Sequence, residues 1–137
     1  MSEHEVRALR GVYDAFDSRD VPAFVGGLAH DIEWRVPDVL PWGGVRHGHE
    51  GVTSFVAILD EHIDGGWGTP EEFLDVGERI VVLGRFSGVA RATGVRFETR
   101  FAHVWTIRDG VPAGFDNFVD TAAIVAALEG RSLPHPA

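Results

Sequence analysis

His103 and Asn117 are the two polar residues whose positions favour chemistry inside a pocket. His103 alternates with Phe101 and Trp105, so the three side chains share one face of a strand. Burial disfavours the imidazolium, so we expect a neutral His103 that serves as general acid/base or donates to an oxyanion. Asn117, on the paired strand, is costly to bury without partners. Either the two side chains satisfy each other or both face a ligand or water. The alternatives are a His103 bonded to a backbone carbonyl and a bulge that turns Asn117 outward.

Aromatic residues near these positions would supply the apolar wall of the pocket. Trp42 lies in a Gly-rich stretch that would rim the opening, and it is the best candidate for gripping a ligand. The expected substrate-binding residues are Trp34, Val36, Trp42, Phe86, Phe101, Trp105 and Phe115. The same aromatic residues also suit an ordinary core, so the pocket depends on how the elements are arranged.

Composition excludes several classes of function. The chain has 137 residues, a net charge of −9, no lysine and no cysteine. Without clustered basic residues we expect neither nucleic acid nor a membrane surface as partner. The absence of cysteine excludes a disulfide framework and fits a reducing compartment. The charged N-terminal residues lack the apolar core of a signal peptide, and no apolar run approaches the ~20 residues of a membrane helix. We therefore expect a cytoplasmic protein.

Metal and cofactor motifs are weak or missing. His47, His49 and Glu50 have the composition of a metal cluster, but no further ligand follows at a recognisable spacing. We expect a surface loop there. No Gly-rich phosphate-binding loop of a recognised spacing is present. The sequence therefore predicts neither a metal nor a cofactor.

Three helices are expected in the first half of the chain. Residues 3–18 place apolar side chains at helical spacing. Asp20 is a suitable N-cap for a second helix, with Pro22 in its first turn, and this helix should stop near His30. Residues 49–63 have a third apolar helical face, and Gly65 and Gly66 would end that helix.

Strands dominate the second half. Residues 32–36 alternate apolar and charged side chains, whereas the breaker-rich stretch from Pro41 to Gly48 predicts a loop. Further strands are expected over residues 72–77, 79–91, 95–107 and 113–119, with a hairpin turn at Arg108–Gly110. Asp120 would cap a last helix over residues 121–128. Residues 1–130 are expected to form one domain and residues 131–137 a C-terminal tail.

Helices followed by successive strands predict an α+β fold with a curved antiparallel sheet. Gly84 and Gly88 inside one long strand favour sharp curvature. A curved sheet closed by helices leaves a cavity at its open end, and the pocket prediction rests on that geometry.

The order of elements resembles the nuclear-transport-factor-2-like cone fold, and within it the SnoaL-like branch. The residues that carry the resemblance are Leu40–Gly44, Gly48–Val52, Phe101–Gly110 and Phe118–Ala122. It spans nearly the whole chain and implies a cone-shaped roll, in which the strongly curved sheet wraps around the N-terminal helices. The motifs say little about activity, because the same cone hosts isomerases, cyclases, epoxide hydrolases and inert binders.

The resemblance also places the family's catalytic positions on this chain. The tyrosine and aspartate of ketosteroid isomerases fall on Val12 and Val36, which cannot move a proton. Their oxyanion-donating acid falls on His103, which can donate. The Asp-Arg-Asp set of limonene epoxide hydrolases falls on Asn117 and near Arg85 and Ser87. An amide is no base there, and we expect Arg85 on the outer face.

Two further residues lie near the family's catalytic positions. Tyr13 neighbours the lost tyrosine position on the first helix and is either an acid or a core aromatic with a solvated hydroxyl. Asp38 follows the strand that carries the aspartate, two positions late, and is either a base or a solvated loop residue.

Three functions remain open at this stage. The first is a cofactor-independent isomerase, cyclase or hydrolase-type enzyme that acts on a small hydrophobic polyketide-, terpenoid- or steroid-like substrate by acid/base catalysis. The second is a binding module for such a small hydrophobic molecule without turnover. The third is a dimerisation domain, because Val81, Leu83, Val89, Ala102 and Val104 predict an apolar outer face suited to a homodimer.

Overall fold

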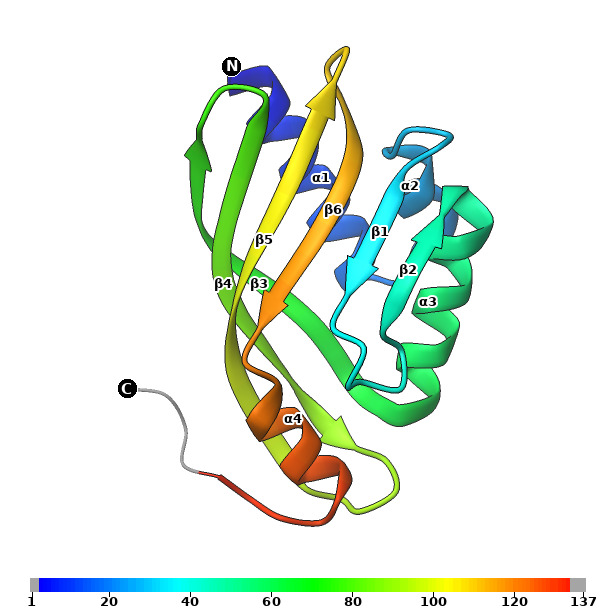
Figure 1. The fold of residues 1–137 in the computed structure, drawn as a ribbon, viewed down its shortest axis with the longest axis vertical. Coiled ribbons are helices and arrows are strands. Elements are labelled where there is room, and N and C mark those ends of the chain that lie inside the picture. Colours follow the sequence, from blue (N-terminus) through cyan, green and yellow to red (C-terminus); the bar gives the residue numbers. More distant parts are fainter. Residues whose placement is uncertain (1–2, 134–137) are drawn as a thin grey trace.

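Helices and a curled sheet form an α+β cone in the computed structural model, which describes residues 3–133 (Figure 1). The helices are α1 (Glu3–Asp17), α2 (Val21–Gly26), α3 (Gly48–His62) and α4 (Thr121–Leu128). The strands are β1 (Glu33–Val36), β2 (Gly44–His47), β3 (Ile63–Asp75), β4 (Arg79–Ala90), β5 (Arg96–Arg108) and β6 (Val111–Val119). This architecture confirms the expected fold class. Residues 134–137 of the expected tail lie outside the described residues.

The strands form one sheet in the order β2-β1-β6-β5-β4-β3. All neighbours are antiparallel except β1 and β6, which pair in parallel. The sheet is therefore mixed, and the expectation of a wholly antiparallel sheet was wrong at this one pair. The chain leaves β2 at one edge, crosses through α3 and enters β3 at the other edge, so the last strand returns beside the first (Figure 1).

The largest differences from the sequence prediction lie in two segments. The stretch predicted as loop contains strand β2, which pairs with β1 between Gly44 (φ 105°) and Gly48 (φ 72°). Gly44 begins the strand and Gly48 follows it. The glycines therefore mark the two ends of a short strand, whereas their number had predicted a loop throughout. Gly65 and Gly66 do not end a helix. Helix α3 stops at His62, and β3 runs through both glycines with a shift of register between Asp64 and Trp67.

Gly84 in β4 lies where strand β3 and the Phe101 ring approach closely. A Cβ atom there would lie 2.2 Å from the carbonyl oxygen of Thr69 and 2.5 Å from the ring of Phe101. Only a glycine lets β3 and the Phe101 ring approach this closely. Gly84 pairs with Pro70, next to a shift of register between Pro70 and Glu72, so the expectation that glycines within the long strand mark curvature or bulges is met here by an irregularity of the strand pairing.

Helix ends are capped as the sequence predicts. The carboxylates of Asp20 and Asp120 accept hydrogen bonds from the amides of Ala23 and Ala122, which fixes where α2 and α4 begin. Helix α2 ends at Gly26, earlier than the predicted end near His30.

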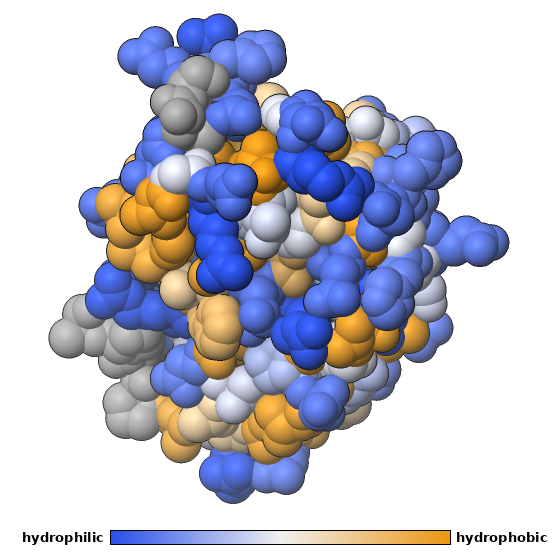
Figure 2. Space-filling view, turned by 45° about the horizontal axis from the view of Figure 1, so that its top comes forward, coloured by the Kyte–Doolittle hydropathy of each residue, from blue (hydrophilic) through white to orange (hydrophobic). Residues whose placement is uncertain are grey.

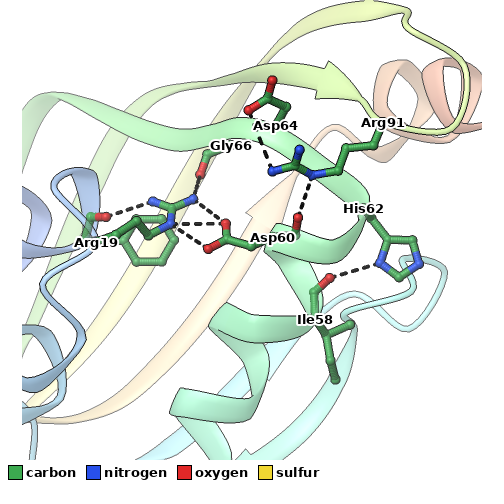
Figure 3. Close-up of polar contacts among 8 residues, drawn as sticks. Arg19, Ile58, Asp60, His62, Asp64, Gly66 and Arg91 are labelled. Atoms are coloured by element: carbon green, nitrogen blue, oxygen red, sulfur yellow. Dashed lines mark hydrogen bonds and ion pairs between the residues drawn. The ribbon is translucent and has the colours of Figure 1, made fainter.

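An arginine cluster joins the N-terminal helices to the sheet (Figure 3). Arg19, which follows α1 with a φ of 57°, donates to both carboxylate oxygens of Asp60 and to the carbonyls of Phe16 and Gly66. Its guanidinium also lies 4.4 Å above the Phe16 ring. These contacts hold the C-terminal end of α1 against α3 and β3, and with it the Phe16 side chain.

The described helices include none that is long and apolar enough to cross a membrane. Figure 2 shows that apolar side chains reach one face of the molecule in several patches separated by hydrophilic ones.

Candidate functional site

The concave side of the sheet and the helices form a cavity lined by residues of all four helices and of five strands. The predicted residues that line it are Tyr13, Trp34, Trp42, Phe86, Phe101, His103, Trp105, Phe115 and Asn117. Val36 is buried but lies outside this lining, and Asp38 is exposed in the turn after β1. The structure thus brings nine of the predicted residues together and leaves out the carboxylate.

The cavity has a volume of about 60 Å³, counted as the space that the centre of a water molecule can reach. One water needs roughly 10–15 Å³ on this measure and takes up about 30 Å³ of liquid, so the space matches a molecule of on the order of ten non-hydrogen atoms. The wall is overwhelmingly apolar, which favours a hydrophobic occupant.

A chain of hydrogen bonds crosses the cavity wall from β5 to α1. The indole nitrogen of Trp105 donates to the Tyr13 hydroxyl over 2.9 Å, and that hydroxyl lies 2.6 Å from Nδ1 of His103. An indole N–H can only donate, so the Tyr13 oxygen is the acceptor there. The phenol proton then goes to His103 Nδ1, the other hydrogen-bond partner of the hydroxyl among residues 3–133.

This chain fixes the tautomer of His103. An Nδ1 that accepts leaves the remaining proton of the neutral ring on Nε2. Nε2 has no hydrogen-bond partner within the described part of the chain, and His103 lines the cavity. His103 therefore presents an N–H donor to whatever occupies the cavity.

Burial keeps both members of the pair neutral. Desolvation lowers the pKa of His103 to about 3. Desolvation also raises the pKa of Tyr13 well above its usual range, against a smaller lowering effect of the hydrogen bond from Trp105. Near neutral pH the pair is an imidazole and a phenol, so it offers oriented donors instead of charges.

Aromatic packing holds the His103 ring in place. The Phe101 ring stacks on it with centroids 3.7 Å apart, and the Phe115 ring meets it edge-on at 4.8 Å. A Cβ at Gly68 would lie 3.1 Å from the Phe101 ring. The absence of side chains at Gly68 and Gly84 therefore leaves space for the stacked rings of Phe101 and His103. The sequence indicated the shared face of β5 but not this stacking.

Asn117 lies directly opposite His103 in the register of β5 and β6, as expected. The two side chains do not satisfy each other, because His103 bonds to Tyr13 instead. The Asn117 Oδ1 atom is buried and lacks a hydrogen-bond partner within residues 3–133. The indole nitrogen of Trp34 is also buried and also lacks a partner there. Both residues line the cavity, so both can meet an occupant.

The sequence missed much of the helical side of the cavity. Val12, Phe16, Phe24, Phe55, Leu59 and Ile124 also line it. Their helical spacing marked buried faces, but spacing does not distinguish a packed core from a cavity wall. The bond between Tyr13 and His103, 90 positions apart, had no local signal either.

The chain has no evident metal-binding cluster in its described part, where no three His, Asp or Glu side chains come together. The His49 imidazole donates to the carbonyl of Leu28 and stacks on His30, and His47 lies 3.6 Å from Glu33. These contacts give the histidines near α3 structural partners.

Comparison with known proteins gives a family and several solved structures. The model of the SnoaL-like domain matches residues 9–111. An NTF2-like protein of unknown function from Burkholderia pseudomallei K96243 is 35% identical over 93% of this chain and 98% of its own, with a TM-score of 0.86. TerC, co-crystallised with polyporic acid, is 29% identical over 93% of this chain and 99% of its own, also with a TM-score of 0.86.

A more distant structure shares the fold alone. It is named as a candidate polyketide cyclase from Xanthomonas campestris pv. campestris, with 18% identity over 92% of this chain and 97% of its own and a TM-score of 0.75. A search of the curated proteins found no match.

Proposed function

Because the chain belongs to the SnoaL-like domain family, we propose that its cavity binds a small neutral carbonyl compound and promotes isomerisation or cyclisation of that molecule without a cofactor. The observation that supports this most directly is the chain from Trp105 through Tyr13 to His103. It ends in an N–H donor on the lining of an apolar cavity. A donor held in this way stabilises negative charge that develops on a carbonyl oxygen.

His103 acts in this proposal as the donor to the developing oxyanion. Its Nε2–H meets the carbonyl oxygen of the substrate, while Tyr13 holds the other ring nitrogen. The apolar wall strengthens the hydrogen bond because it excludes water. The low pKa of His103 means that it donates as a neutral imidazole and does not have to lose a charge.

The reaction best suited to this cavity is intramolecular. Among the described residues, its lining contains no carboxylate and no cation. A proton that leaves carbon must therefore pass to the substrate's own oxygen or to water. Isomerisation and ring closure need no second reactant, so orienting one molecule supplies much of the rate enhancement.

The names of two relatives bear on this proposal, TerC through its ligand. TerC was crystallised with a small organic molecule, and the Xanthomonas protein is named as a candidate cyclase. Neither name assigns a substrate to this chain.

Turnover of cyclohex-3-enone to the conjugated cyclohex-2-enone, followed by ultraviolet absorbance, tests the proposal. This isomerisation moves one proton from the carbon next to the carbonyl to the far end of the double bond. We expect His103→Leu to lower kcat/KM by roughly 100-fold, as for loss of one oxyanion donor. Tyr13→Phe should lower it less, because the ring keeps its N–H but loses its fixed tautomer. Turnover that is unchanged in His103→Leu/Asn117→Leu would refute the assignment.

A binding function without turnover is the second candidate, and the missing carboxylate favours it. Under this alternative, cyclohex-3-enone binds, its carbonyl resonance shifts in ¹³C NMR, and no conjugated product appears. His103→Leu should then abolish the shift, which separates a binding cavity from an inert one.

We also propose that a second copy of the chain covers the outer face of the sheet. Leu83, Ala102 and Phe118 lie side by side across β4, β5 and β6, and Phe118 is 57% exposed. Arg100 lies on one side of this row and Asp116 on the other. A two-fold axis through the row would bring each arginine near the partner copy's aspartate, as an isologous interface requires.

A further inference from the structure

The cavity contains two buried polar atoms that lack a protein partner among the described residues. They are Oδ1 of Asn117, an acceptor, and Nε1 of Trp34, a donor. Buried polar groups in native proteins are nearly always paired, and an unpaired one destabilises the fold. Because both residues line the cavity, an occupant or bound water can satisfy them.

The register of the sheet places the acceptor beside the donor of His103. His103 and Asn117 are direct partners across β5 and β6, and cross-strand Cβ atoms on one face are about 5 Å apart. His103 offers Nε2–H, because Tyr13 occupies Nδ1. The wall thus presents a donor and an acceptor side by side, and the complementary molecule has an acceptor next to a donor.

The rest of the lining restricts that molecule further. Within the described residues no side chain that is charged at neutral pH lines the cavity. An anionic ligand would be desolvated there without a counter-charge, which is strongly unfavourable. The Trp34 ring stacks on Phe115 at 3.9 Å, so its unpaired N–H belongs to the same apolar wall and can meet a second oxygen.

We infer that the ligand is a neutral hydroxy-ketone, whose carbonyl oxygen accepts from Nε2 of His103 and whose hydroxyl donates to Oδ1 of Asn117. This inference rests on the proposed function and adds the polar pattern of the substrate. A single ketone oxygen would satisfy His103 and leave Asn117 unpaired. A carboxylate would fill both positions with acceptors, and its charge would be buried.

The test compares two neutral probes that differ by one hydroxyl, 2-hydroxy-1-phenylethanone and acetophenone. Each has about the size that the cavity admits. By calorimetry, we expect the hydroxyl to tighten binding about tenfold in the wild-type protein, as for one buried hydrogen bond. In Asn117→Leu the advantage should vanish, and in Asn117→Asp, which keeps an acceptor oxygen, it should persist. Benzoylformate, the anionic analogue, should not bind measurably.

The outcomes separate this inference from the proposed function. If both ketones bind equally to the wild-type protein, or if the hydroxyl advantage survives in Asn117→Leu, the hydroxy-ketone inference is wrong and water satisfies Asn117. If neither ketone binds, the proposed function itself fails. Should Asn117→Leu not fold, Asn117→Ala provides the same comparison, since it also lacks the acceptor.

Discussion

At the scale of single residues, the neutral state of His103 makes stability depend on pH. Its pKa is about 3 in the folded chain and 6.5 without the protein environment. Between these values the unfolded chain holds a proton that the folded chain does not, so the free energy of unfolding rises with pH. The contribution of His103 is complete above pH 6.5 and is lost as the pH falls towards 3.

The pH effect is measured by urea unfolding at pH 7 and pH 5. One proton corresponds to at most about 1.4 kcal/mol per pH unit, so we expect the wild-type protein to lose about 1–2 kcal/mol more than His103→Leu over this range. The ion pair with Arg108 holds the pKa of Asp31 below its usual range, so this carboxylate stays ionised above pH 5.

The control for this experiment is His47→Leu, which removes a histidine with a 68% exposed side chain. It should keep the pH dependence of the wild-type protein. Equal pH dependence in the wild-type protein and His103→Leu would mean that His103 is not held neutral by the fold.

Residue types and alternation were enough to predict that His103 and Asn117 face inward on neighbouring strands. They did not predict that Tyr13 takes the imidazole nitrogen. That contact depends on how α1 crosses the sheet, and a periodic pattern fixes which face of a helix is buried without fixing the atom that it meets.

At the scale of elements, the close approach of β3 and the Phe101 ring to β4 depends on Gly84. A Cβ at Gly84 would contact the backbone of β3, which cannot move without breaking the pairing of the two strands. We expect Gly84→Ala to destabilise the protein by about 1–3 kcal/mol, the usual effect of overpacking, and to distort the Phe101–His103 stack. Urea unfolding measures the first effect, and the His103 ring resonances report the second.

The matched control is Gly11→Ala in α1, where an added Cβ would meet no atom within 4 Å. Alanine is the better helix former, so this variant should be more stable by about 0.5–1 kcal/mol. A Gly84→Ala protein as stable as Gly11→Ala would contradict the packing argument.

Elements with strong periodicity were predictable, and those defined by pairing were not. Strands β4 and β5 alternate over a dozen residues, and the predicted row of Phe101, His103 and Trp105 on β5 lines the cavity. Strand β2 has only four residues and exists because β1 lies beside it. The parallel contact of β1 with β6 likewise follows from the path of the chain through α3, which no local pattern encodes.

At the scale of the whole molecule, the cone fold follows from the sequence, whereas the size of its cavity does not. The sequence placed Trp42 at the rim, but it is only 2% exposed and lines the interior. The cavity of about 60 Å³ is small compared with the side chains that surround it. Its volume therefore depends on the rotamer of each lining side chain, which the sequence pattern does not specify.

The proposed dimer predicts that a charge on the outer face of the sheet weakens self-association. Phe118→Asp puts a charge into the centre of the apolar row, so we expect it to raise the dimer dissociation constant by roughly 30-fold or more, the effect of losing an interface hot spot. Light scattering after size exclusion measures the mass. Val39→Asp changes a similarly exposed residue (60%) in the turn between β1 and β2 and should leave the mass unchanged. If the wild-type protein is a monomer at all concentrations, or if both variants shift together, the second copy does not bind through this row.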